Sequence, residues 1–196
     1  MLDETALDTI FRKARTQNGW QDRPVSDAEL RAIYDLAKWG PTSANCSPMR
    51  LQFVKSPAAK ERLKPFLNPG NVEKTMAAPA VAIIGYDLAF YDHLPKLFPH
   101  NTDARNWFAG DEKATHAATT AFRNGSLQGA YLIIAARALG LDCGPMSGFN
   151  AAGIDREFWA GTSVKTNFLC SIGHGDPAKI FARSPRFAFD EVAKIL

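Results

Sequence analysis

The sequence contains little cysteine, and what it has is scattered. Cys46, Cys143 and Cys170 are the three cysteines of the 196 residues, and they form neither a C-x-x-C pair nor a zinc-binding pattern. A disulfide-stapled or zinc-stabilised domain is therefore excluded. Widely spaced thiols in an odd number are typical of a reducing compartment, so we expect a cytoplasmic protein. The four histidines also lack metal-site spacing, and we expect no bound metal.

Long hydrophobic runs and a strong imbalance of charge are also missing. The longest apolar stretches, residues 77–84 and 130–136, are far too short to span a bilayer, and the N-terminus lacks the pattern of a signal peptide. The formal net charge is +3, and no dense cluster of Lys and Arg accompanies it. That charge does not fit a nucleic-acid-binding surface. We therefore expect neither membranes nor nucleic acids as partners.

The composition is that of an ordinary globular protein, with 46% hydrophobic and 22% charged residues. No internal repeat, low-complexity tract or linker-like change of composition divides the chain. We therefore predict one domain over residues 1–196.

Hydrophobic periodicity and capping signals predict more helix than strand. We expect helices over residues 7–14, 26–39, from 57 onward, 71–78 and 111–139, and strands over residues 51–55, 79–86 and 166–172. The two kinds of element do not alternate regularly along the chain. This order favours an α+β fold over a doubly wound α/β sheet.

The predicted helix at residues 111–139 is rich in alanine and glycine and is apolar on more than one face. A helix of this kind must be covered from more than one side. Its own domain could supply the whole cover, but in so short a chain the pattern favours a second copy. We therefore expect a homodimer.

Four polar or glycine-rich stretches follow predicted elements, at residues 15–20, 41–48, 140–149 and 183–186. Their arginines can each bind a phosphate or carboxylate through paired hydrogen bonds. Their serines and asparagines offer neutral donors and acceptors, and their glycines let the backbone approach a flat ligand closely. Together they suit a ligand with an anionic tail and a polar heteroaromatic head. Each stretch taken alone also fits a solvated loop.

These motifs, taken together and in their order along the sequence, resemble those of the nitroreductase superfamily over nearly the whole chain. The matching segments are Arg15-Thr16 with Trp20, residues 41–49, residues 71–74, residues 139–149, and the pair Arg183 and Arg186. The resemblance implies a central, mostly antiparallel sheet flanked by helices. It also implies an intertwined homodimer built on the long helix, with two FMN sites at the interface.

Residues 18–20, 38–48, 97–100 and 140–149 are similar to the malonic semialdehyde reductase branch, whose members also carry the name NADH dehydrogenase/NAD(P)H nitroreductase. This similarity implies the reduction of malonic semialdehyde to 3-hydroxypropionate, in pyrimidine degradation, with NADH or NADPH as electron donor. The sequence leaves open a general nitro or quinone reductase, a non-catalytic FMN-binding module, and a hydrolase or transferase of a phosphorylated substrate. Ser147, where many members have Glu, and Ser-Pro-Met at residues 47–49, in place of Gln-Pro-Trp, argue against nitroaromatics as natural acceptors.

The resemblance also implies cofactor-binding residues from both subunits. In one subunit, the FMN phosphate would be held by Arg15, Arg183 and Arg186, with Thr16 and Asn18 beside them. Asn71, supported by Lys74, would face the polar edge of the ring. The N5 side of the ring would be lined by Pro145, Met146, Ser147 and Gly148. From the partner subunit, Ser43 and Asn45 would contact the ribityl chain or ring. The flavin carries the hydride chemistry, so we expect no catalytic residue from the protein itself.

Residues 90–108 are the candidate wall of the substrate pocket, because they mix aromatic and basic side chains between prolines. We expect Arg105 or Lys96 to pair with a substrate carboxylate. A surface excursion with a few anchoring aromatics fits this segment equally well. Cys46 lies inside the predicted site, but no neighbouring feature would activate its thiol.

Overall fold

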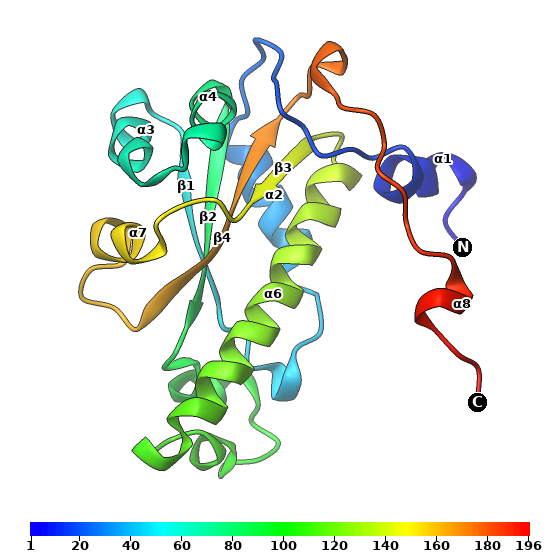
Figure 1. The fold of residues 1–196 in the computed structure, drawn as a ribbon. Coiled ribbons are helices and arrows are strands. Elements are labelled where there is room, and N and C mark those ends of the chain that lie inside the picture. The colour runs from blue at the N-terminus through cyan, green and yellow to red at the C-terminus, as the bar shows by residue number, and fades with distance from the viewer.

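The computed structural model describes all of residues 1–196, and a four-stranded sheet lies at its centre (Figure 1). The strands are β1 (Met49–Val54), β2 (Ala80–Asp87), β3 (Asp142–Met146) and β4 (Val164–Gly173), in the spatial order β1-β2-β4-β3. All neighbouring strands are antiparallel, and Cys170 of β4 pairs with Ala82 on one side and Pro145 on the other. The predicted α+β class is confirmed.

Helices flank this sheet. They are α1 (Glu4–Leu7), α2 (Asp27–Ala37), α3 (Pro57–Leu63), α4 (Pro69–Ala77), α5 (Leu94–Leu97), α6 (Ala114–Ala138), α7 (Ala151–Phe158) and α8 (Phe189–Val192). The predicted capping box of α2 is present, because Ser26 Oγ accepts from the Glu29 N–H at 3.2 Å and Glu29 Oε2 accepts from the Ser26 N–H at 2.7 Å. Ser56 caps α3 through its side chain alone, because its Oγ accepts from the Ala59 N–H at 3.2 Å.

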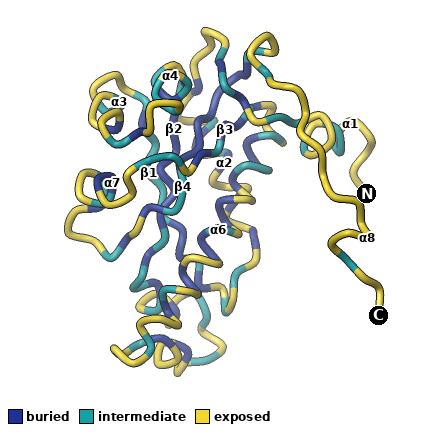
Figure 2. The backbone as a smooth tube through the Cα atoms, in the orientation of Figure 1, coloured by how far each residue is buried: buried dark blue, intermediate teal, exposed yellow.

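Both faces of the sheet are buried, and the alternation along β2 shows how. Ala80, Ala82 and Ile84 belong to a core cluster with residues of α2 and α6, whereas Val81 and Ile83 belong to a second cluster with residues of α3 and α7. Figures 1 and 2 show these helices on opposite sides of the buried sheet. Successive strand residues point to opposite faces, so an almost wholly apolar strand is what two helical layers require.

The longest helix, α6, packs closely on the sheet. A Cβ at Gly129 would lie 2.6 Å from the Phe168 ring of β4, so glycine is needed at this crossing. The opposite side of α6 keeps Leu127 and Tyr131 exposed to solvent, and Phe122, whose ring lies 5.5 Å from that of Tyr86 in β2, is also half exposed. Packing on the sheet therefore explains the apolar residues on one side of α6, and it does not explain the exposed Leu127 and Tyr131 on the other.

Strand β3 and the helices α7 and α8 were not predicted, and the first helix is displaced. Strand β3 contains Gly144 and Pro145, residues that disfavour strands, but it lies at the edge of the sheet, where a proline need not donate to a further neighbour. Helix α7 begins at a short polar signal, Asn150, whose side chain accepts from the Gly153 N–H at 3.0 Å. The helix predicted at residues 7–14 begins earlier, as α1, and continues as a single π-helical segment at Asp8–Arg12.

Residues 90–108, the candidate wall of the substrate pocket, contain three short helical segments, namely Phe90–His93, α5 and Ala104–Trp107. Phe90, Leu94 and Phe108 form a third core cluster with Ala117 and Ala121 of α6. The segment is therefore anchored on the first half of α6. None of the helices has the length and apolarity needed to cross a membrane.

Candidate functional site

The segment that follows the N-terminal helix lies against strand β3. Thr16 forms a parallel bridge with Cys143, and the Gln17 N–H donates to the Cys143 carbonyl at 3.0 Å. A Cβ at Gly144 would lie 2.7 Å from the Gln17 carbonyl oxygen, so this approach requires glycine. The first and third predicted stretches are therefore in direct contact.

Helix α4 joins the same place from the other side. Asn71 Nδ2 donates to the Gly148 carbonyl at 2.8 Å, and Lys74 Nζ lies 3.5 Å from Asn18 Oδ1. Trp20 Nε1 donates to the Lys74 carbonyl at 2.9 Å, which ties α4 to the N-terminal segment. Asn18, Asn71, Lys74 and Gly148, all predicted from the sequence, therefore belong to one polar cluster.

The basic residues of the N- and C-terminal stretches also meet. An Arg15 guanidinium N–H donates to the Phe181 carbonyl, and Arg183 Nη2 donates to the Ala14 carbonyl at 3.1 Å. Arg186 contacts only carbonyls of its own turn, Ser184 and Pro185, at 3.0 and 2.9 Å. None of the three arginines has an acidic partner within ion-pair distance. Their charges remain available to an anion.

The residues at the end of β3 differ in accessibility. Met146 is buried, and its sulfur lies 3.3 Å from Thr75 Oγ1, so its side chain faces the core beneath α4. Ser147 is exposed, and Pro145 and Gly148 are partly exposed. Within this stretch the backbone and Ser147, rather than the Met146 side chain, are accessible to a ligand.

Ser43 and Asn45 lie elsewhere, in a loop that α6 holds. Asn124 Oδ1 accepts from the Ser43 N–H at 2.9 Å, and Gln128 Oε1 accepts from the Met49 N–H at 2.9 Å. Both amide side chains are buried, at 1% and 5% exposure, and they lie one helical turn apart. Buried amides of this kind fix the two ends of the loop to one rigid helix.

The loop at residues 43–47 is strained. Ala44, Asn45 and Ser47 have φ angles of 48°, 50° and 38°, in the left-handed region that side chains other than glycine and asparagine avoid. Such conformations cost on the order of 1–3 kcal/mol each and cluster where a ligand or a reaction needs a fixed geometry. The local backbone thus supports the interpretation of this loop as part of a binding site.

Cys46, between these strained residues, is an anchor. Its side chain is 1% exposed and packs in the cluster with Phe90 and Leu94. Burial raises the pKa of the Cys46 thiol to about 11, so the thiol stays protonated near neutral pH. Cys46 therefore holds the loop in place and does not serve as a nucleophile.

One chain thus contains two separate groups of predicted site residues. The first group surrounds β3 and α4 and contains Thr16, Asn18, Asn71 and residues 145–148, with Arg15 directly before Thr16 and Arg183 bonded to the Ala14 carbonyl. The second group is Ser43 and Asn45, in the loop that Asn124 of α6 holds (Figure 1). Asn124 is about 21 Å along the helix axis from the end of α6, after which β3 begins. No hydrogen bond or ion pair joins the two groups.

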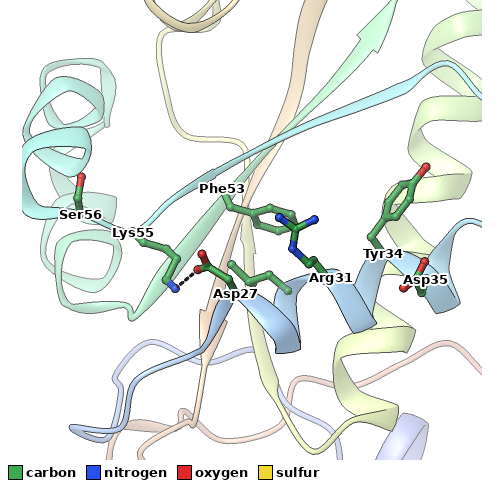
Figure 3. A pocket seen from close by; sticks show the side chains of 8 residues that line it. Asp27, Arg31, Tyr34, Asp35, Phe53, Lys55 and Ser56 are labelled. Atoms are coloured by element: carbon green, nitrogen blue, oxygen red, sulfur yellow. Dashed lines mark hydrogen bonds and ion pairs between the residues drawn. The ribbon is translucent and has the colours of Figure 1, made fainter.

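One hollow of the chain contains none of these residues. It measures about 950 Å³ and lies between α2 and β1, where Phe53 and Tyr34 accompany charged side chains (Figure 3). Lys55 and Asp27 form an ion pair there. Because its lining lacks the convergent donors of the polar cluster, its size alone does not make it the functional site.

A second hollow, of about 530 Å³, adjoins the strained loop and is lined by Asn45, Ser47, Arg50, His93 and Lys96 among others. Asn45 and Lys96 were predicted from the sequence, but Arg50 was not. Its one distinguishing signal is that it is the single charged residue of strand β1. Arg50 Nη2 pairs with Asp87 at 2.6 Å, and Asp87 is 6% exposed.

The chain belongs to the nitroreductase family, whose family model matches residues 12–174. Within that family, a protein of Cupriavidus pinatubonensis, provisionally named NADH dehydrogenase/NAD(P)H nitroreductase, is 64% identical over 195 residues and covers 100% of both chains. The resemblance inferred from the motifs is thereby confirmed.

Solved structures agree on the fold. A nitroreductase-type protein of Bacillus subtilis superposes with a TM-score of 0.87 at 18% identity, covering 99% of this chain and 100% of its own. Another, from Exiguobacterium sibiricum and solved in complex with FMN, superposes with a TM-score of 0.82 at 20% identity, covering 100% of this chain and 98% of its own.

We predict that iodoacetamide at pH 8 leaves Cys46 unmodified in the folded protein. With a pKa of about 11, roughly one thiol in a thousand is ionised at that pH, and the side chain is buried as well. Mass spectrometry after labelling should detect modification only when guanidinium chloride is added first. Rapid labelling of Cys46 in the native protein would contradict its role as a buried anchor.

Proposed function

We propose that the chain is an NAD(P)H-dependent FMN oxidoreductase that works as a homodimer and reduces a small carbonyl compound, namely malonic semialdehyde to 3-hydroxypropionate. The observation that carries the proposal is that the residues suited to binding a cofactor fall into two groups, and no hydrogen bond or ion pair within one chain joins these groups. The names of the relatives as NAD(P)H nitroreductases support the class of reaction. We place the reaction in the cytoplasm, in keeping with three free thiols.

The donor chemistry of the first group fits FMN. The unpaired guanidinium groups of Arg15 and Arg183 suit a phosphate, and each charge-assisted hydrogen bond contributes roughly 1.5–3 kcal/mol. The amides of Asn18 and Asn71 with the Lys74 ammonium suit the polar edge of a heteroaromatic ring. When bound, FMN supplies hydride transfer from NAD(P)H to the acceptor. The E. sibiricum neighbour is a precedent for FMN on this fold.

The protein's own part is binding and orientation. The Cys46 thiol, next to Asn45 in the chain, stays protonated, because burial raises its pKa to about 11. The amides of Asn124 and Gln128 keep the strained loop in one conformation, so that Ser43 and Asn45 need no reordering when a ligand arrives. These residues fix geometry and exclude water around the reacting groups, and we assign no acid, base or nucleophile among them.

The homodimer is supported by apolar side chains that the single chain leaves in solvent. Phe122, Leu127 and Tyr131 are exposed along α6, and Trp39 after α2 is 79% exposed. Residues 180–196 leave the body of the chain with Phe187 and Phe189 exposed (Figures 1 and 2). Large apolar side chains left in solvent on several elements are typical of a surface that another chain covers. A second copy packed on α6 would bring Ser43 and Asn45 of the partner subunit to the first group.

The choice of malonic semialdehyde rests on the similarity at residues 18–20, 38–48, 97–100 and 140–149. A general nitro or quinone reductase remains the alternative acceptor class, and an FMN-binding module without turnover is the alternative without an acceptor. The exposed Ser147, where many members of the family have an acidic group, argues against nitroaromatics as the natural acceptors.

We predict that Arg15→Ala weakens FMN binding by about 10- to 100-fold, because it removes one charge-assisted contact to the phosphate. Arg12→Ala is the matched control, since Arg12 lies three residues earlier and is paired with Glu4 and Asp8 at 2.7 and 2.8 Å. The change should be measured by titrating the flavin-free protein with FMN and following flavin fluorescence. Equal affinities for both variants would remove Arg15 from the phosphate site.

We predict that the purified protein is yellow, that anaerobic NADH or NADPH bleaches it, and that malonic semialdehyde restores the colour faster than quinones or nitroaromatics do. Stopped-flow absorbance of the flavin measures each half-reaction. Faster reoxidation by a quinone or nitroaromatic would select the general reductase, and a flavin that no nicotinamide reduces would select the binding module. A colourless protein that takes up no added FMN would overturn the proposal.

A further inference from the structure

We propose that the hollow beside the strained loop binds the carboxylate of the acceptor and that Lys96 is the residue that selects for it. This inference rests on the proposed function and names the substrate class, a short aldehyde that carries a terminal carboxylate. The hollow measures about 530 Å³, which is sufficient for a small ligand. Asn45 and Ser47 line it, so it opens directly beside the loop assigned to the flavin.

The charges around the hollow are all of one sign. Its lining includes the basic residues Lys38, Arg50, His93 and Lys96 and no acidic residue. Three of these have acidic neighbours outside the lining. Lys38 Nζ lies 2.6 Å from Asp35, Arg50 Nη2 lies 2.6 Å from Asp87, and His93 Nε2 lies 3.9 Å from Asp87. Lys96 is the one basic residue of the hollow without an ion-pair partner, so its charge is left for a ligand.

Arg50, which also lines the hollow, makes structural contacts. Arg50 Nη1 donates to the carbonyls of Ser47 and Met49, at 3.1 and 3.0 Å, while its Nη2 binds Asp87. Its donors are therefore occupied by the backbone at the end of the strained loop. Arg50 holds the wall of the hollow in position and leaves the recognition of an anion to Lys96.

Lys96 is fixed close to the loop by its own helix. It belongs to α5, where Asn45 Nδ2 donates to the carbonyl of the next residue, Leu97, at 2.8 Å. The side chain of Leu94 in the same helix is fully buried in the cluster with Phe90. The backbone of α5 is thus anchored, while the exposed ammonium group of Lys96 is free to reach a ligand beside Asn45.

The other basic candidate, Arg105, is already engaged. Its guanidinium group lies 2.8 Å from Asp92 and 5.8 Å from the centre of the Tyr91 ring, and it does not line the hollow. Of the two residues that the sequence nominated for a substrate carboxylate, the geometry therefore points to Lys96.

An anion at this position could come from the acceptor or from a phosphate of the nicotinamide cofactor. One unpaired ammonium group matches the single charge of a carboxylate, whereas phosphate recognition commonly uses the paired donors of arginine. The only arginine of the hollow has those donors occupied. The charge count therefore favours the carboxylate.

The test compares malonic semialdehyde with propanal, an aldehyde of the same length without the carboxylate, at saturating NADH. Lys96→Met should lower the ratio of kcat/KM for the semialdehyde to that for propanal by about 10- to 100-fold, mainly through KM. Lys96→Arg, which keeps the charge, should retain most of the wild-type ratio. Lys64→Met should keep the full ratio, because Lys64 lies outside the hollow in an exposed pair with Glu61.

Two outcomes would overturn the inference while leaving the proposed function intact, provided that NADH still reduces the flavin in each variant. One is an unchanged ratio in Lys96→Met. The other is a rise in KM for NADH or NADPH without a change for the semialdehyde, which would assign Lys96 to a cofactor phosphate. If NADH fails to reduce the wild-type flavin, the proposed function itself is wrong, and the carboxylate assignment falls with it.

Discussion

The rigidity of α6 is the constraint on which the rest of the structure depends. The helix is 25 residues long, about 37 Å, and one side of it is fixed to the sheet where Gly129 meets Phe168. Its buried amides, Asn124 and Gln128, hold the strained loop near the middle of the helix. Strand β3 with its polar neighbours begins beyond the C-terminal end of the helix. Because a packed helix does not bend to join them, the two groups of predicted site residues stay apart within one chain.

The division of the site explains why its residues look like binding groups rather than reagents. Arg15 and Arg183 hold the chain ends together through backbone carbonyls and keep their charges unpaired. Asn124, Gln128 and the buried Cys46 hold the strained loop in place, and these contacts offset the conformational free energy that its left-handed residues cost. A flavin that carries its own reactivity needs such a rigid, complementary surface more than it needs an acid or a base.

Local signals in the sequence predicted most of the fold, and non-local contacts account for the rest. The capping box at Ser26 and the apolar run of β2 depend on neighbouring residues, and both are present. Strand β3 was missed because only its edge position makes Pro145 tolerable. The resemblance predicted the residues of both groups, and their role in binding a cofactor stays a prediction. Whether Lys96 or Arg105 is free could not be predicted, because the answer depends on Asp92, thirteen residues from Arg105 in sequence.

The most direct test of a site built from two chains is complementation between two defective variants, Arg15→Ala and Asn45→Ala. In a mixed dimer, one site collects both substitutions and the other has Arg15 and the partner's Asn45 intact. Refolding the two variants together should therefore restore one full FMN site, with tight flavin binding and NADH-dependent turnover, in each mixed dimer. If the mixture binds and turns over no better than the separate variants, each site lies within a single chain and the account is wrong.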